Sequence, residues 1–295
     1  MRLRTLFAQG LTLGEGPRWC HDGLWWVDII RGLLFHSRWQ NDGFTPPQQW
    51  DLLAQVGMIG ALAPLATGGL VLATQQGWQH FDPVSGRCTP LANPCPDPQI
   101  RCNDGAVDPA GRFITGTMPL DMAPGQGCLW SLDPDGRVRQ LMSGLTCPNG
   151  LAWNAAGNEM AFIDSPQRAI GIYAYDVQRG IVGQQLRRIA VDNVAGVPDG
   201  CCLDQQGTLW VAFWGGGCVR GYDFASGELR QHLSCPCSQI TACALAGPLC
   251  DHLVITSAAL DCAEPEAGNC FVMPLNTVGW PAAAWAGDLP GGEPR

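Results

Sequence analysis

The chain of 295 residues repeats one short pattern six times, and this repeat constrains the fold more than any other feature. Each copy consists of a glycine, or a near equivalent, followed by alternating apolar residues. The copies end at residues 28, 74, 117, 164, 213 and 257, so the intervals between them are 46, 43, 47, 49 and 44 residues. A period in the middle forties, with several short strands in each repeat, is typical of propeller blades.

Turn residues separate the apolar segments throughout the chain. One example is Gly127–Leu132, which is followed by Asp133-Pro134-Asp135-Gly136, and such residues suit tight turns between antiparallel strands. Helical periodicity is nearly absent, and we interpret the ambiguous run from Trp50 to Leu65 as the end of one blade and the start of the next. The sequence therefore predicts an all-β fold, a six-bladed β-propeller, as a single domain over residues 1–295.

The two ends of the chain have separate expectations. The first ten or so residues should add a strand to the last blade, which would close the ring and remove open sheet edges. The tail 289–295 is expected to be flexible.

Charge and cysteine content exclude several functional classes. The net charge is −9 and there is no lysine, so Schiff-base and Ser-Lys mechanisms are excluded and nucleic acid is not an expected partner. The N-terminus lacks the apolar run of a signal peptide, and no stretch approaches the roughly 20 apolar residues of a membrane span. Fifteen cysteines, an odd number without a C-x-x-C pair, predict free thiols in a reducing compartment. We therefore expect a cytoplasmic protein without a membrane partner.

A shorter strand precedes each copy of the repeat, and in four of the six a polar residue followed by glycine recurs in it. The pairs are Glu15-Gly16, Asp104-Gly105, Asn149-Gly150 and Asp199-Gly200. The first strand of each propeller blade lines the central channel, so equivalent positions converge near the axis. We therefore predict that the four polar residues form a ring at one mouth of the channel. The alternative is that each pair is only a turn former.

The composition of this predicted ring points to a hard cation. Carboxylate and amide oxygens without thiolate or imidazole suit one divalent cation, with Ca²⁺ as the first expectation and Zn²⁺, Mn²⁺, Mg²⁺ or Fe²⁺ as alternatives. Carboxylates crowded at a channel mouth would repel each other strongly without a cation. The sequence contains no G-x-S-x-G, H-E-x-x-H or Walker motif, so those catalytic arrangements are not expected.

The chain resembles the sugar lactonase family that includes gluconolactonase, regucalcin (senescence marker protein) and luciferin-regenerating enzyme. The resemblance covers nearly the whole chain. It is carried by L-G-E-G-P-x-W at Leu13–Trp19, R-x-N-D-G-x-V-D-P-x-G-R at Arg101–Arg112, N-G-L-x-W at Asn149–Trp153 and P-D-G-x-x-x-D-x-x-G-x-L-W-V-A at Pro198–Ala212. It implies a six-bladed propeller that binds one divalent cation through Glu15, Asn149 and Asp199.

The same resemblance implies a substrate and a reaction. Arg101, Asn103 and Asp121 would bind a small-molecule sugar lactone, and the enzyme would hydrolyse an aldonolactone such as gluconolactone, xylonolactone, galactonolactone or arabinolactone. Asp199 would act as the catalytic base. Because successive strand residues face opposite ways, we expect Asn103 to touch substrate and Asp104 to support the metal site through hydrogen bonds.

Other functional classes stay open at this point. One is a different metal-assisted hydrolase, such as an esterase or phosphotriesterase, and another is a calcium-binding regulatory protein or an interaction propeller. The expected assembly is a monomer or a weak homo-oligomer.

Overall fold

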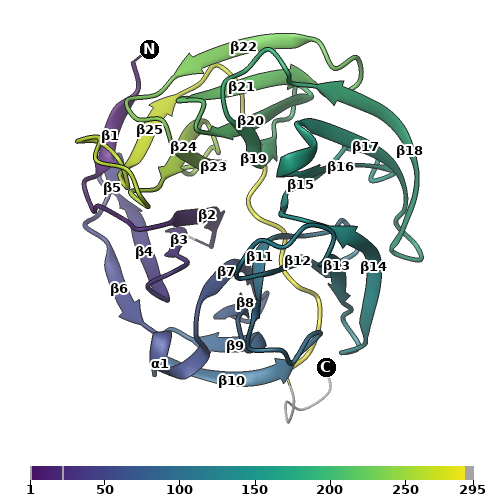
Figure 1. The fold of residues 1–295 in the computed structure, drawn as a ribbon. Helices are drawn as coiled ribbons and strands as arrows, with labels where there is room; N and C mark the ends of the chain where they lie inside the picture. Colours follow the sequence, from purple (N-terminus) through teal and green to yellow (C-terminus); the bar gives the residue numbers. More distant parts are fainter. Residues whose placement is uncertain (1, 22, 290–295) are drawn as a thin grey trace.

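The computed structural model describes residues 2–21 and 23–289, and in it six antiparallel sheets surround a central axis (Figure 1). Five sheets have four strands and the first in sequence has five. Short helical segments are the α-helix α1 (Leu53–Val56) and the 3₁₀ helix η1 (Ser165–Gln167). The predicted all-β, six-bladed propeller is therefore confirmed.

In each blade, the innermost strand and the second strand from the axis are the most buried. The innermost strands are β2 (Gly14–Cys20), β7 (Ile59–Pro64), β11 (Ile100–Val107), β15 (Pro148–Trp153), β19 (Val197–Leu203) and β23 (Ile240–Ala246). The second strands are β3 (Gly23–Asp28), β8 (Leu70–Thr74), β12 (Phe113–Pro119), β16 (Glu159–Asp164), β20 (Thr208–Trp214) and β24 (His252–Ser257). The second strands are the six copies of the sequence repeat.

The outer half of each blade is more exposed. The third strands are β4 (Leu33–Gln40), β9 (Gly77–Asp82), β13 (Gly127–Leu132), β17 (Ala169–Asp176), β21 (Cys218–Asp223) and β25 (Cys270–Pro274). The outermost strands are β6 (Gln48–Asp51), β10 (Arg87–Ala92), β14 (Val138–Leu145), β18 (Ile181–Ala190), β22 (Leu229–Ser234) and β1 (Arg4–Phe7), while the short β5 (Gly43–Phe44) also pairs with β4. The ambiguous run at 50–65 contains the end of β6, α1 and β7, as the repeat required.

Apolar clusters between neighbouring blades form the core. Four of the five clusters join the first four neighbouring pairs of blades in order, and the fifth joins blades five, six and one. Each blade presents alternating side chains to both neighbours, so each sheet is buried on its two faces. All fifteen cysteines are free thiols, and each is buried or half-buried.

The ring is closed by strands from the two ends of the chain. β1 pairs antiparallel with β25, with Arg4 opposite Val272 and Thr5 opposite Phe271. The last blade thus takes its outermost strand from the N-terminus, as the sequence predicts. This pairing supplies β25 with a neighbour on its outer edge.

Residues 275–289, here called the strap, run from β25 across the middle of the ring (Figure 1, yellow). Backbone N–H groups of the strap donate to Trp19 O and Pro64 O at 2.7 and 2.9 Å, at the ends of β2 and β7. The strap covers a cavity of about 190 Å³ at this end of the channel, lined by Arg18, Leu245 and the strap residue Trp280 among others. Of the tail 289–295, only Leu289 lies within the described residues, and it packs partly buried against an apolar cluster.

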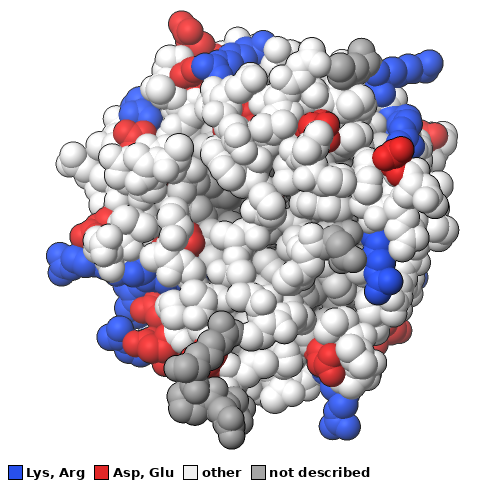
Figure 2. Space-filling model, turned by 180° about the vertical axis from the view of Figure 1, so that it is seen from behind, with Lys and Arg blue, Asp and Glu red and all other residues white. Residues whose placement is uncertain are grey.

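Figure 2 shows the face of the molecule turned away from the viewer in Figure 1. Charged side chains lie mainly toward its rim, where arginines alternate with acidic residues. In the described ranges, the structure contains no helix of the length and apolar character needed to cross a bilayer.

Trp285 is expected to be the main anchor of the strap. Its side chain is 3% exposed, packs between blades two and three, and donates Nε1–H to Leu132 O at 3.2 Å. Trp285→Ala should lower the free energy of unfolding by about 3–5 kcal/mol, because it removes a large buried aromatic group. Trp280→Ala is the matched control on the same strap, and its 47% exposed side chain predicts a loss below about 1 kcal/mol. Denaturant unfolding measures both, and equal losses would contradict the assignment.

Candidate active site at the channel mouth

The four polar–glycine pairs lie inside the innermost strands and not in turns. Each of these strands shifts register beside the pair: between residues 15 and 18 in β2, 102 and 105 in β11, 148 and 151 in β15, and 198 and 201 in β19. Such a bulge takes backbone groups out of the ladder and redirects side chains. The interpretation of the pairs as simple turn formers is therefore wrong.

Close packing of the innermost strands explains the glycines of blades four and five, whereas Gly16 has a left-handed φ of +55°. A Cβ on Gly150 would lie 2.8 Å from Asp199 O on the next blade, and one on Gly200 would lie 2.5 Å from the Cβ of Ala242. Neither position is a left-handed turn, so the requirement is for space. Any other residue would push neighbouring blades apart at the axis.

The ring side chains converge in a buried position at the channel mouth. Glu15, Asp104, Asn149 and Asp199 are each only 5 or 6% exposed. Glu15 Oε2 accepts a hydrogen bond from Gly16 N–H at 2.9 Å, and Asp104 Oδ1 accepts one from Gly105 N–H at 2.7 Å. Asp199 likewise accepts a hydrogen bond from the backbone of Gly200. The bulges supply these donors, because the glycine N–H groups are not used in the ladder.

Electrostatic strain is concentrated on two of these carboxylates. Burial, and then the neighbouring Asp104, raise the pKa of Glu15 to about 8. Burial, and then Glu15 and Asp104, raise the pKa of Asp199 well above its ordinary value. Asp199 Oδ1 is buried and has no hydrogen-bond partner among the described residues. A buried oxygen of this kind is costly unless another group binds it.

Asp104 differs from the other two carboxylates because an arginine neutralises it. Arg18 Nη2 lies 3.2 Å from Asp104 Oδ1 and also donates to Gly105 O at 2.8 Å. Arg18 also lines the cavity under the strap, so it approaches the ring of polar side chains from the side of that cavity. Sequence reasoning did not identify Arg18, although it lies within the G-P-R-W segment of β2.

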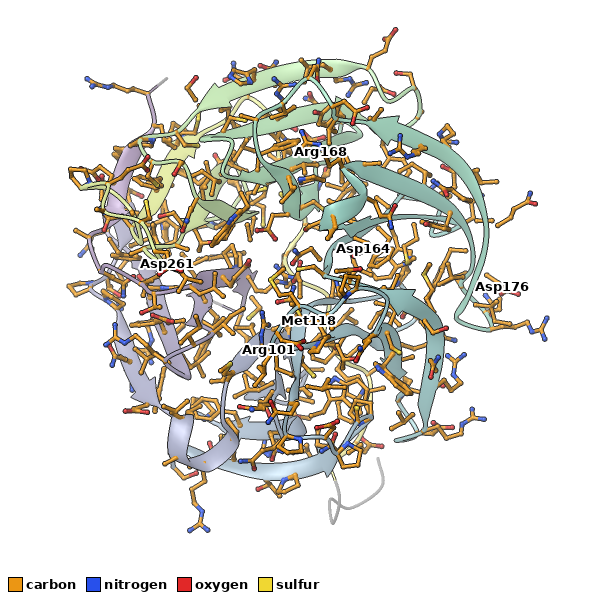
Figure 3. The ribbon with its side chains drawn as sticks, viewed as in Figure 1. Arg101, Met118, Asp164, Arg168, Asp176 and Asp261 are labelled. Carbon is orange, nitrogen blue, oxygen red and sulfur yellow. The ribbon has the colours of Figure 1, made fainter. Side chains whose placement is uncertain are left out.

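Arg101 and Asn103 extend the polar set from β11 toward blade four. Arg101 lies close to the axis beside Met118, its partner on β12 (Figure 3). Its Nη1 donates to Asn103 Oδ1 at 2.6 Å, and Asn103 Nδ2 donates to Asn149 Oδ1 at 2.8 Å. Burial lowers the pKa of Arg101, while nearby groups, Glu15 and Asp199 among them, raise it. The structure therefore brings these two residues into the ring.

Asp121 lies apart from this network. It is exposed in the turn after β12, and its Oδ1 accepts a hydrogen bond from Ala123 N–H at 3.0 Å. The hydrogen bond from Leu120 N to Gln99 O, 2.8 Å, places this turn beside the start of β11. Among the residues that the structure describes, no hydrogen bond or ion pair joins Asp121 to the ring.

A second residue missed by sequence reasoning contacts Asn149. Asn149 Nδ2 donates to Ser165 Oγ at 2.8 Å, and Ser165 Oγ donates to Pro198 O at 2.7 Å. Ser165 directly follows β16 and begins η1. Its position after the repeated strand was visible in the sequence, but its contacts were not, because no pattern in the sequence shows that Ser165 Oγ joins Asn149 of its own blade to Pro198 O of the next blade.

The residues present fit a hard cation. Glu15 and Asp199 form no ion pair with a basic side chain of the described residues. They lie with the amide oxygen of Asn149, and Asp199 Oδ1 is unpartnered. Oxygen donors of this kind suit Ca²⁺ or a similar ion. Within residues 2–21 and 23–289, no group of three or more His, Cys, Asp or Glu side chains converges as a metal cluster. The candidate set here contains an amide as its third donor.

Comparison with known proteins gives a consistent picture. Residues 13–259 match the family described as SMP-30/Gluconolactonase/LRE-like region. A regucalcin of Danio rerio is 32% identical over 286 residues, which cover 93% of this chain and 95% of that protein. A pentonolactonase of Haloferax volcanii is 34% identical over 251 residues, which cover 84% of this chain and 82% of that protein.

A solved structure shares the whole architecture. It is described as a calcium-binding protein, regucalcin, from Agrobacterium tumefaciens, and it is 26% identical with a TM-score of 0.87. The match covers 96% of each chain.

Because its carboxylates are buried, the cation-free protein is expected to lose stability as the pH rises. Glu15 titrates near its ordinary value of 4.5 when unfolded and near 8 when folded, so between these values the folded protein binds more protons. The free energy of unfolding should therefore fall as the pH rises from about 5 to 8, by up to about 1.4 kcal/mol per pH unit for one proton.

Unfolding by urea with a chelator present measures this slope. Glu15→Gln should flatten it, and added Ca²⁺ should reduce it, because a cation stabilises the ionised carboxylates. Parent and Glu15→Gln slopes that coincide with chelator would contradict the prediction.

Proposed function

This chain belongs to the SMP-30/gluconolactonase/LRE-like family, and on that premise we propose that it hydrolyses the lactone of a sugar acid to the open aldonic acid. The proposed substrates are aldonolactones such as gluconolactone, xylonolactone, galactonolactone and arabinolactone. The observation that carries the proposal is the buried, unpartnered Asp199 Oδ1 inside a ring of oxygen donors. The lactonase name of the Haloferax relative supports the substrate class.

Glu15, Asn149 and Asp199 are the residues proposed to hold one divalent cation. Ca²⁺ is favoured, because the Agrobacterium relative is described as calcium-binding, and Zn²⁺, Mn²⁺, Mg²⁺ and Fe²⁺ are alternatives. When bound, such a cation supplies Lewis-acid stabilisation of the charge that develops on the lactone carbonyl oxygen. Asp104 is proposed to support these residues from the side of the strap cavity, where it forms an ion pair with Arg18.

Asp199 is proposed to be the catalytic base. Water attacks the carbonyl carbon, a proton of that water passes to Asp199, and the ring C–O bond breaks. The leaving alkoxide takes up that proton from Asp199, so the products are a carboxylic acid and a hydroxyl group. With a cation bound, Asp199 would be held as the ionised carboxylate, which is the form that can accept the proton of the attacking water.

Arg101 and Asn103 are proposed to bind the hydroxyl and carbonyl oxygens of the sugar. A guanidinium has five N–H donors, and the hydrogen bonds of Arg101 to Cys102 O and Asn103 Oδ1 use only Nη1, so donors remain for a ligand. Asp121, at the edge of the same mouth, is proposed to complete the substrate site as an acceptor of sugar hydroxyls. A neutral lactone is not repelled by the net charge of −9.

We propose that the six blades act as one domain, because the proposed site takes residues from blades one, three, four and five. A monomer or weak homo-oligomer suffices for this site, since all of its residues come from one chain. The fifteen free thiols support a reducing, cytoplasmic location.

The test of the function is acid release from the four named lactones, with and without a chelator. We expect turnover of at least one lactone and its loss on chelation. Asp199→Ala should abolish turnover and reduce the rise in Tm on adding cation, because the cation stabilises the folded state by binding it. Turnover of simple esters or phosphotriesters in place of every lactone would favour the other hydrolase class. Cation binding without any turnover would favour a regulatory protein.

The substrate and cation roles should separate in Arg101→Ala. We expect kcat/KM to fall about ten- to a thousandfold, equivalent to about 1–4 kcal/mol of lost transition-state contact. Cation affinity should fall by less, because Arg101 contacts no proposed ligand directly and affects Asn149 only through Asn103.

Arg168→Ala is the matched control for this substitution. The Arg168 side chain (Figure 3) donates to Gly196 O and Val194 O, and among the described residues it forms no hydrogen bond with the ring, so kcat/KM should stay near the parent value. Normal turnover together with damaged cation binding in Arg101→Ala would instead make Arg101 part of the cation site.

A further inference from the structure

We infer that Ser165 is a positioning residue whose hydroxyl orients the Asn149 side chain, so that the amide oxygen and not the nitrogen faces the cation site. The identity of that cation site rests on the proposed function. The orientation of the Asn149 amide rests on its hydrogen bonds with Ser165 and Asn103.

The two ends of an asparagine amide are nearly equal in size, so the side chain of Asn149 could adopt two orientations. The Oδ1 and Nδ2 of asparagine have nearly the same shape, but only the oxygen can bind a cation. If Asn149 turned over about its last side-chain bond, an NH₂ group would face the buried carboxylates. The surrounding donors and acceptors must therefore select one orientation.

Ser165 selects the orientation from one side. Its hydroxyl hydrogen is directed to Pro198 O at 2.7 Å, so toward Asn149 it presents a lone pair. That lone pair accepts from Asn149 Nδ2 at 2.8 Å. In the reversed orientation two acceptors would face each other, and the hydroxyl would have to abandon the buried Pro198 carbonyl to relieve this.

Asn103 selects the same orientation from the other side. Its Nδ2 donates to Asn149 Oδ1 and to Pro148 O, both at 2.8 Å. Asn103 cannot reverse without loss, because its Oδ1 accepts from Arg101 Nη1, and a guanidinium can only donate. A reversed Asn149 would therefore place two NH₂ groups against each other.

The result is a directional hydrogen-bond chain from Arg101 through Asn103, Asn149 and Ser165 to Pro198 O. It begins at a group that only donates and ends at a carbonyl that only accepts, so its polarity is set at both ends. The chain passes from blade three through blade four to the carbonyl just before Asp199 in blade five. It thereby fixes the Asn149 oxygen relative to the neighbouring carboxylate.

The backbone holds Ser165 in place for this role. Ser165 is 4% exposed, and its N–H donates to Cys147 O at 3.1 Å. The preceding Asp164 (Figure 3) accepts hydrogen bonds from the N–H groups of Thr146 and Cys147, which directly precede β15. These hydrogen bonds therefore hold the start of η1 against the start of β15, which carries Asn149.

The experiment is a double-mutant cycle on Ca²⁺ affinity, measured by calorimetry on the full chain. Ser165→Ala should weaken binding by about 10- to 100-fold, as for other groups that orient metal ligands. In an Asn149→Asp background the same change should weaken binding by less than about threefold, because a carboxylate presents oxygen in either orientation. A purely structural role would give equal losses in both backgrounds, and that result would overturn the inference.

Two further variants keep the test decisive. Ser165→Cys preserves the side-chain volume but replaces the hydroxyl by a weakly bonding thiol, so it should show the same background-dependent loss even if Ser165→Ala does not fold. Ser131→Ala is the matched control, since this buried serine donates to Asp133 and not to the ring, and its Ca²⁺ affinity should equal that of the parent.

The outcomes separate this inference from the proposed function. Unchanged affinity in Ser165→Ala and Ser165→Cys, with a parent that binds Ca²⁺ and hydrolyses a lactone, would overturn the inference alone. A parent that binds none of Ca²⁺, Mn²⁺ and Zn²⁺ would overturn the cation site and the inference together. A parent that binds Ca²⁺ and shows the predicted cycle without hydrolysis would sustain the inference and overturn the proposed activity.

Discussion

The close approach of the innermost strands around the axis is the constraint on which the site depends. Gly150 and Gly200 permit this approach, since a Cβ at either position would enter the neighbouring strand. The residues that precede them, Asn149 and Asp199, are therefore held in a small common space. Bulges beside Glu15 and Asp104 free the N–H groups of Gly16 and Gly105 to donate to those carboxylates. The close approach of the innermost strands thus determines both the packing at the axis and the geometry of the site.

Such a site is destabilising by itself, and the rest of the molecule compensates for it. Glu15 and Asp199 are both buried. Asp104 raises the cost of ionising Glu15, and Glu15 and Asp104 raise the cost of ionising Asp199. The apolar clusters between blades supply the opposing stabilisation, because every sheet buries two faces. Buried charge that does not help folding is common at functional sites, where it is retained for chemistry.

The repeat made the fold and the four ring positions predictable, because a fixed period places equivalent residues at equivalent distances from the axis. Glu15, Asp104, Asn149 and Asp199 needed only this register. The partners of these residues were not predictable. Arg18 reaches Asp104 from a blade 86 residues away in sequence, and the contact of Ser165 with Asn149 depends on how the turn after β16 places the serine hydroxyl. The strap was missed for another reason: it has no counterpart in the repeat and forms no regular strand that a periodic pattern would reveal.

Closure of the ring by β1 and β25 has a consequence for biosynthesis. β1 is synthesised before the other strands of the propeller, and its partner lies about 265 residues later in the chain. Until β25 is synthesised, β1 has no partner and β24 exposes an open edge, and pairings this distant in sequence form slowly. This is the interval in which two nascent copies are most prone to exchange strands. Molecular chaperones that shield exposed strand edges would therefore matter most late in translation.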